Sequence, residues 1–205
     1  MKKILAAFTA ALLLVSLAAC GGRSGMSEEE MRETFRTLVE ASYELNDIYY
    51  GVGLPFVHDE DAMAFLAGIA ADTDGYKFSY MPVAEDASYK TEADIRAATS
   101  AVFSPDLCSH LFVLGFEGLS TENDERVAFA RYIEQDGTLT VRIDLAEEAL
   151  KLGRTYDFST MKVQLEEKDR VRAQFASLVD GVPSQNVRIT IIKTADGWRL
   201  DSPTY

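Results

Sequence analysis

The sequence predicts an α+β domain in which N-terminal helices pack on one face of a C-terminal antiparallel β-meander. Two patterns lead to this fold class. Apolar residues recur every three or four positions over residues 27–50, which is typical of an amphipathic helix. From about residue 127 they recur at every second position, which is typical of strands. Helices followed by strands indicate an α+β domain rather than a parallel α/β sheet.

The first helix is predicted to begin at Ser27, because Ser27 and Glu30 have the spacing of a capping box. Glutamates in its first turn complement the helix dipole. It is expected to end near Tyr50, since Gly51, Gly53 and Pro55 follow. The predicted buried stripe consists of Met31, Phe35, Leu38, Ser42, Leu45 and Tyr49.

The next segments alternate between helical and extended patterns. Residues 62–71 are rich in alanine and favour a helix, with Asp59 or Asp61 as its cap. Residues 76–80 alternate like a strand, which Pro82 ends.

Two short helices are predicted next, the first capped by Thr91 and the second begun by Ser104 and Pro105. Their inward-facing residues are expected to be Ile95, Ala98, Thr99 and Val102 in the first helix and Leu107, Leu111 and Leu114 in the second.

The strands of the meander are marked by turn residues. Asp136-Gly137 is a hairpin signal between two alternating runs, and residues 145–152 form a helix-like link. Further strands are predicted over residues 161–165, 171–175, 187–191 and 198–200, with turns at 167–169, 180–183 and 196–197.

The N-terminus has the organisation of a secretory signal. Lys2 and Lys3 precede an uncharged run over residues 4–17, which is shorter than the roughly 20 residues of a membrane-spanning helix. The following Leu17-Ala18-Ala19-Cys20 resembles the bacterial lipobox, whose cysteine becomes the lipid-bearing first residue. An ordinary signal peptide with a chance cysteine is the alternative.

The lipobox interpretation divides the chain into three parts. Residues 1–19 are expected to be a signal peptide, residues 20–26 a lipidated cysteine and flexible tether, and residues 27–205 a single α+β domain. The protein would then be lipid-anchored through Cys20 at the extracytoplasmic face of the cell membrane. Cys108 would be the only remaining thiol, so no internal disulfide is expected.

Charge restricts the class of partner. Loss of Lys2 and Lys3 with the signal changes the formal net charge from −13 to −15. Such acidity disfavours nucleic-acid binding, which depends on neutralising phosphates, and argues against a domain lying flat on anionic lipid. It fits high solubility or attraction of a basic partner.

The sequence offers few groups for catalysis, and we expect no enzyme and no cofactor. It contains no phosphate-binding loop, dinucleotide fingerprint or zinc spacing. Cys108 and His110 are two apart on a predicted helix and therefore point in different directions. An inert buried cysteine is the simpler interpretation.

Two acidic segments are candidate calcium sites. The first, residues 58–61, reads His-Asp-Glu-Asp and supplies oxygen ligands, but four consecutive side chains cannot all converge on one ion. The second contains Glu122, Asp124 and Glu125. Solvated loops are the favoured interpretation of both, and no metal site is predicted.

The apolar segment from Tyr50 to Phe56 is flanked by glycines at a helix end and fits two interpretations. Its side chains could line a binding pocket, in which case the contact residues are Tyr50, Val52, Leu54 and Phe56. It could equally be a connection that crosses the core, and the core interpretation is favoured.

The order of elements and the closing segment 196–202, Asp-Gly-Trp-Arg-Leu-Asp-Ser, resemble the NTF2-like and cystatin-like lipoproteins of Gram-positive bacteria. A narrower resemblance is to the IseA family of secreted inhibitors of cell-wall DL-endopeptidases. It rests on four segments, 48–52, 76–80, 95–112 and 189–202. The lipid anchor departs from that family, whose inhibitor is released.

The narrower resemblance implies a non-enzymatic regulator that binds a peptidoglycan hydrolase of the NlpC/P60 type and blocks its cleft. No inhibitory residue is carried over, because no motif position matches sharply. The alternative function is an NTF2-like module that binds a small ligand in an aromatic-lined pocket.

Overall fold

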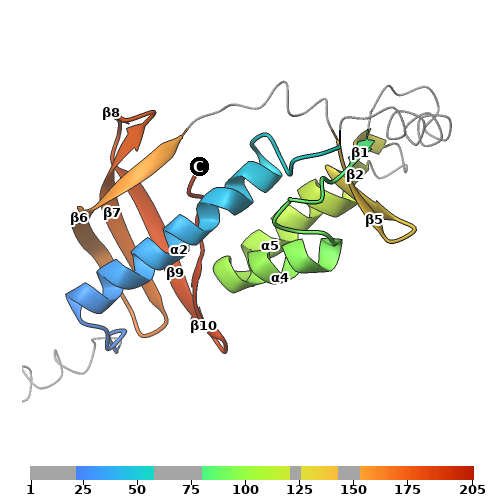
Figure 1. The fold of residues 1–205 in the computed structure, drawn as a ribbon. Coiled ribbons are helices and arrows are strands. Elements are labelled where there is room, and N and C mark those ends of the chain that lie inside the picture. The colour runs from blue at the N-terminus through green and yellow to red at the C-terminus, as the bar shows by residue number, and fades with distance from the viewer. Residues whose placement is uncertain (1–21, 58–79, 121–125, 143–152) are drawn as a thin grey trace, which may run out of the picture.

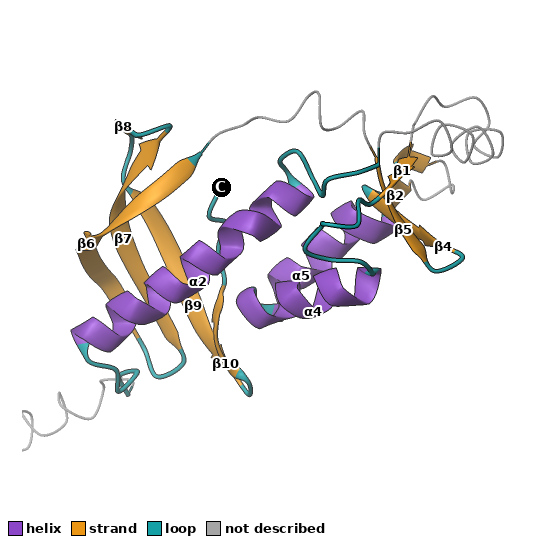
Figure 2. Cartoon of the chain, viewed as in Figure 1, coloured by secondary structure: helices purple, strands orange, loops and turns teal. Residues whose placement is uncertain are grey.

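The computed structural model describes residues 22–57, 80–120, 126–142 and 153–205. A long helix, α2 (Glu28–Tyr49), crosses one face of an antiparallel sheet. Two shorter helices, α4 (Glu92–Val102) and α5 (Pro105–Phe112), lie between this sheet and a smaller one (Figures 1 and 2). The predicted α+β class, with helices on one face of a C-terminal meander, is confirmed.

The larger sheet contains the predicted meander. Its order is β10-β9-β7-β6, and the short β8 pairs with β7 off this path. The strands span β6 (Arg154–Glu166), β7 (Arg170–Val179), β8 (Val182–Pro183), β9 (Val187–Thr194) and β10 (Gly197–Leu200). Val171, Ala173 and Phe175 of β7 are buried against α2, as their alternation predicts.

Helix α2 begins with the predicted capping box. The Ser27 hydroxyl accepts a hydrogen bond from Glu30 N at 3.2 Å, and the Glu30 carboxylate accepts one from Ser27 N at 2.7 Å. Its buried stripe is Met31, Phe35, Val39, Ser42, Leu45, Ile48 and Tyr49, whereas Leu38 is only partly buried. At the centre, the Phe35 ring meets the Phe175 ring edge-on, with 5.2 Å between centroids.

The predicted hairpin at Asp136-Gly137 is confirmed, and both residues have positive φ, 50° and 78°. It joins β4 (Tyr132–Gln135) to β5 (Thr138–Arg142) but does not continue into the larger sheet. Instead β5 pairs with β1 (Tyr80–Pro82), which gives a three-stranded sheet of order β1-β5-β4.

The two short helices have the predicted caps. Thr91 Oγ1 accepts from Asp94 N at 3.1 Å, and Ser104 Oγ accepts from Leu107 N at 3.4 Å. Ile95, Thr99, Val102 and Leu111 are buried.

The expectation that Leu114 faces inward is wrong, because this side chain is 38% exposed. Helix α5 ends at Phe112, and the chain continues as a π-helical turn, η1 (Val113–Glu117), closed by a bond from Gly118 N to Val113 O. A π turn contains more residues than an α turn, so the spacing of three or four no longer keeps Leu114 on the buried face. After it, β2 (Leu119–Ser120) pairs with β3 (Arg126–Ala128).

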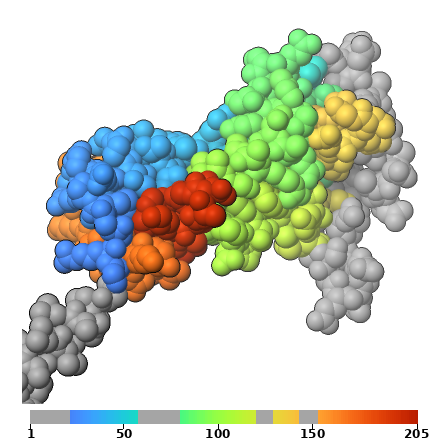
Figure 3. All heavy atoms as spheres, turned by 90° about the horizontal axis from the view of Figure 1, so that it is seen from below, coloured from blue at the N-terminus to red at the C-terminus, as the bar shows by residue number. Residues whose placement is uncertain are grey.

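The C-terminal residues connect the two halves of the fold. Leu200 at the end of β10 forms a parallel bridge with Phe103, and Leu200 O accepts a bond from Ser104 N at 2.7 Å. Thr204 is buried, and its hydroxyl lies 2.6 Å from the Ser42 hydroxyl of α2. The space-filling view shows the red C-terminal residues between the blue α2 and the green helices (Figure 3).

Several sequence predictions lie outside the described residues. These are the signal peptide and Cys20, the helix over 62–71 with its caps, most of the strand over 76–80, the link over 145–152, and the acidic segments 58–61 and 122–125.

Candidate functional site

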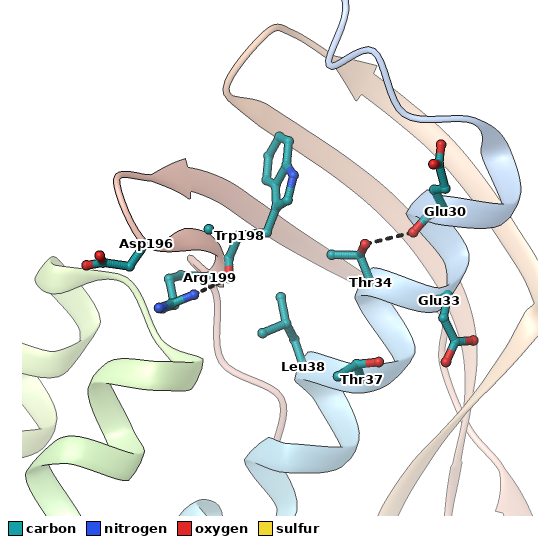
Figure 4. A pocket seen from close by; sticks show the side chains of 9 residues that line it. Glu30, Glu33, Thr34, Thr37, Leu38, Asp196, Trp198 and Arg199 are labelled. Carbon is teal, nitrogen blue, oxygen red and sulfur yellow. Dashed lines mark hydrogen bonds between the residues drawn. The ribbon is translucent and has the colours of Figure 1, made fainter.

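An open groove with a volume of about 510 Å³ lies between α2 and the tip of the β9–β10 hairpin (Figure 4). Segments about 160 residues apart in the sequence form its two walls. Its lining residues are Glu30, Glu33, Thr34, Thr37, Leu38, Asp196, Gly197, Trp198 and Arg199. We call this surface the Trp198 groove.

The α2 wall is acidic and held in place by local bonds. Hydrogen bonds from Ser27, of which the backbone bond is the stronger influence, lower the pKa of Glu30. Glu33 is paired with Arg36 at 2.7 Å, and Thr34 Oγ1 donates to Glu30 O at 2.7 Å. These contacts give the wall a fixed shape, with carboxylates near its upper end (Figure 4).

The opposite wall carries the single tryptophan of the chain. Trp198 is partly buried against the core, and its ring remains on the groove surface. Arg199 fixes the hairpin, because its Nε donates to Ser100 O at 2.9 Å and its guanidinium also donates to Trp198 O at 2.9 Å. The groove therefore combines an aromatic surface, two threonine hydroxyls and three carboxylates on rigid elements.

A second groove, of about 310 Å³, lies on the other side of the same hairpin, against α4 and α5. Asp196 and Arg199 line both grooves. Cys108 also lines the second one but is buried, and its thiol donates to Phe103 O at 3.5 Å. Burial raises the pKa of this thiol, which disfavours the reactive thiolate.

Cys108 and His110 do not form a pair. His110 is exposed and lines a different cavity, beside Tyr50 and Tyr205. In the described part of the chain, no three His, Cys, Asp or Glu side chains gather closely enough to hold a metal ion.

The four side chains predicted as a binding loop lie in different surroundings. Tyr50 and Val52 are each 39% exposed, whereas Leu54 is buried and Phe56 is partly buried beside Val83. The Tyr50 ring lies 4.2 Å from the Tyr205 ring and lines a cavity of only about 30 Å³. The structure does not bring the four residues to one pocket.

A pair of buried side chains from the start of β4 explains why this loop crosses the core. The Arg131 guanidinium donates to Tyr49 O at 3.3 Å and to Gly51 O. The Tyr132 hydroxyl donates to Ile48 O at 3.0 Å and accepts from Leu54 N at 3.2 Å. These bonds satisfy carbonyls at the C-terminal end of α2, where a cation is also favoured by the helix dipole.

Gly53 shows how closely the loop is packed. Its φ is +80°, and a Cβ added there would lie 3.1 Å from Tyr132 Oη and 3.2 Å from the Arg131 guanidinium. Both the backbone angle and the close approach therefore require glycine. Gly53 and Leu54 are thus packed against the core, whereas Tyr50 and Val52 at the start of the segment remain exposed.

No known protein family model matches the chain, and no curated protein shows significant similarity to it. Within the described residues, no helix combines the length and apolar character needed to cross a bilayer.

The Trp198 groove was not predicted from the sequence. The sequence predicts a turn and a strand within the segment 196–202 and a family-like ending, and it marks the carboxylates of α2 as a helix start, but it assigns neither to a binding surface. The single tryptophan, directly after a turn, was the only signal in the sequence for a binding surface. The α2 wall of the groove could not be assigned to the same surface without the tertiary fold.

Proposed function

We propose that this protein is a lipid-anchored, extracytoplasmic binding protein that regulates a peptidoglycan endopeptidase of the NlpC/P60 type. In this proposal the Trp198 groove receives the partner. The observation that carries it is an open, aromatic and acidic groove on rigid elements of a chain that begins with a lipobox-like signal.

The end of the tether supports anchoring close to the membrane. Ser24 Oγ donates to Glu166 Oε1 at 2.9 Å, and Met26 packs against the core. Ser24 follows Cys20 by four positions in the sequence, which corresponds to at most about 14 Å of extended chain. A lipid on Cys20 would therefore hold the β6–β7 end of the sheet near the headgroups.

The groove has the chemistry of a protein-binding surface. Tryptophan is among the residues that contribute most to interfaces, because it buries a large apolar area when a partner docks. Asp196 favours basic side chains on that partner, whereas the Glu33 carboxylate is already paired with Arg36. The groove is wide and open, which suits a protruding segment of another protein.

The cavity beside Tyr50 gives no support to the small-ligand alternative. Its volume is about 30 Å³, whereas pockets for small molecules are usually about 300 Å³ or larger. This cavity is therefore too small to hold a ligand beneath the loop.

The described segments of the IseA resemblance lie together in the fold. Tyr50, Phe103 and Leu107 line one cavity, and Phe103 bridges to Leu200. This proximity supports a shared packing arrangement, and the choice of a wall hydrolase as partner rests on the resemblance and on the expected location.

Replacement of Trp198 tests the partner. We expect the mature chain to inhibit wall lysis by a purified NlpC/P60-type endopeptidase, and Trp198→Ala to weaken inhibition at least about tenfold, because an aromatic contact of about 1.4 kcal/mol or more is lost. Tyr205→Ala, at an exposed aromatic outside the Trp198 groove, is the control. Absence of inhibition by the unaltered chain, or equal inhibition by a folded Trp198→Ala variant, contradicts the proposal.

Replacement of Cys20 tests the anchor. We expect Cys20→Ser to move the protein from the membrane to the soluble fraction, while Cys108→Ser leaves it in the membrane, because the Cys108 thiol is buried. Mass spectrometry of the mature N-terminus should show a lipid on Cys20. A free, unmodified Cys20 in the mature protein would exclude the anchor.

A further inference from the structure

The face of the larger sheet opposite α2 carries a set of basic side chains. Pairing across β6, β7 and β9 arranges them in three successive rows. These rows are Lys162–Gln174–Arg188, Leu165–Arg172–Thr190 and, with β10, Arg170–Ile192–Arg199. Each row contains a cation, and we call this surface the basic sheet face.

Its side chains are open to solvent. Lys162, Arg170, Arg172 and Arg188 are all exposed, whereas the alternate residues of β7 are buried against α2. Arg199 shares the register of the third row, but its Nε donates to Ser100 O of α4 and its side chain lines the Trp198 groove, so it is not counted with this face.

Carboxylates neutralise this face only in part. Asp201 lies 3.6 Å from Arg170, in an ion pair that is partly exposed. Asp157, opposite Ala176, accepts bonds from the backbone and hydroxyl of Ser159. Glu167 and Asp169, both exposed in the β6–β7 turn beside Arg170, add two further carboxylates at that end. The excess of positive charge therefore lies over the middle of β6, β7 and β9, at Lys162, Arg172 and Arg188.

The acidity of the rest of the molecule does not cancel this local charge. The acidic surface of α2 lies on the opposite side of the sheet from the basic sheet face. The distance between the two surfaces is roughly 15 Å, the sum of a layer spacing of about 10 Å and a helix radius of about 5 Å. The Debye length at physiological ionic strength is about 8 Å. An anionic surface against the basic sheet face therefore experiences mainly the nearby cations.

The arrangement carries a cost for folding. Arg170 and Arg172 are neighbours on one face of β7, and Arg188 is diagonal to Arg172. Like charges at these positions repel one another, and only Arg170 is paired with a carboxylate in the described residues.

The tether reaches the larger sheet at the end that carries the β6–β7 turn. Glu166, which holds Ser24, precedes the β6–β7 turn, and Arg170 follows that turn. Arg23, itself 84% exposed, lies 4.0 Å from Glu166. The basic sheet face thus begins within reach of the residue expected to carry the lipid.

We propose that the basic sheet face binds the anionic phospholipid headgroups of the membrane to which the chain is tethered. This inference adds to the proposed lipid anchor a second, electrostatic contact that fixes the orientation of the domain. The Trp198 groove lies on the α2 side of the sheet, so it would face away from the membrane and remain open to a partner. The overall acidity of the chain by itself argues against contact with anionic lipid. In this proposal the cations gathered on the basic sheet face determine the interaction instead, because they are the charges nearest to the membrane.

Vesicle binding tests this orientation without the lipid. The mature chain from residue 20 with Cys20→Ser retains all described elements and is mixed with vesicles of phosphatidylcholine, with or without phosphatidylglycerol, at about 0.15 M ionic strength. We expect binding only when phosphatidylglycerol is present, and release at about 1 M salt. Equal binding to both vesicles, or binding to neither, overturns the proposal.

The residues are tested by Arg170→Gln, Arg172→Gln and Arg188→Gln combined. We expect affinity for the anionic vesicles to fall about 100-fold, since each cation near an anionic surface contributes about fivefold. The matched control removes the same charge elsewhere, with Arg36→Gln, Lys90→Gln and Lys193→Gln combined, and should change affinity less than about threefold. An equal loss in both variants shows diffuse attraction and overturns the proposal.

Two further measurements keep the outcome clear. The melting temperature of the Arg170/Arg172/Arg188 variant should equal or exceed that of the parent, because repulsion between the arginines is relieved. If this variant does not fold, Arg172→Gln and Arg188→Gln are tested singly. Each is then expected to lower the affinity for anionic vesicles about fivefold. Binding to purified anionic wall polymer but not to vesicles would overturn the lipid assignment. The vesicle assay contains neither a lipid on Cys20 nor a hydrolase. A failure to bind vesicles is therefore distinct from a failure of the proposed hydrolase regulation or lipid anchor.

Discussion

Phe35→Ala is expected to lower the free energy of unfolding by about 4 kcal/mol, the range found when a buried phenylalanine is truncated. Phe35 is fully buried where α2 crosses the sheet, and its ring meets Phe175 edge-on at 5.2 Å. The centroid of the Phe175 ring lies 5.6 Å from that of Phe158. Truncation of Phe35 therefore leaves a cavity beside an aromatic cluster. Urea denaturation of the mature chain measures the loss.

Two controls separate this cavity effect from a general loss of apolar surface. Phe35→Leu retains most of the volume and should cost about 1.5 kcal/mol or less. Val182→Ala removes methyl groups from a side chain that is 65% exposed and should change stability by less than about 0.5 kcal/mol. A Phe35→Ala loss below about 1 kcal/mol would show that α2 does not depend on this contact.

Arg131→Met is expected to lower the free energy of unfolding by about 3 kcal/mol, because two buried carbonyls at the end of α2 lose a charged donor. Arg131 is 4% exposed, and within the described residues no carboxylate forms an ion pair with it. Its contribution therefore comes from hydrogen bonds and from the dipole at the helix C-terminus. Chemical denaturation followed by circular dichroism measures the change.

Arg131→Lys is the informative companion to this variant. A lysine has one donor group and cannot hold two carbonyls in the forked geometry of a guanidinium, so we expect an intermediate loss of about 2 kcal/mol. Tyr132→Phe removes the neighbouring hydroxyl bond to Ile48 O, and its effect should not add to that of Arg131→Met, because both side chains hold the same loop. Unchanged stability in Arg131→Met would mean that the cost of burying the cation offsets its bonds.

The helix signals in the sequence are reliable because they act locally. The Ser27 capping box and the Thr91 and Ser104 caps each join residues three apart, so they form wherever the helix is placed. The same holds for Asp136-Gly137, whose positive φ angles specify a hairpin turn. The prediction for Leu114 was wrong because a π turn changes the helical period, and no residue type there signals that change.

Strand partners required the tertiary structure. Residues 132–142 alternate as strands, but the alternation does not indicate whether they pair with β6 or with Tyr80–Pro82. Arg131 lies within the stretch from about residue 127 that the sequence predicts as strand, and only the fold places its side chain at the end of α2. The candidate loop from Tyr50 to Phe56 could be interpreted as pocket or core until Tyr132 and Arg131 were located beside it.

The sequence by itself determined the α+β class, the N-terminal caps of the described helices and the hairpin turn at Asp136-Gly137, because these depend on contacts between residues close in the chain. It also supplied the lipobox-like signal at Cys20 and the overall acidity. Only the tertiary structure decided which surfaces exist. The Trp198 groove joins α2 to β10, and the basic sheet face aligns cations from β6, β7 and β9. Both depend on strand order and register, which are set by long-range packing.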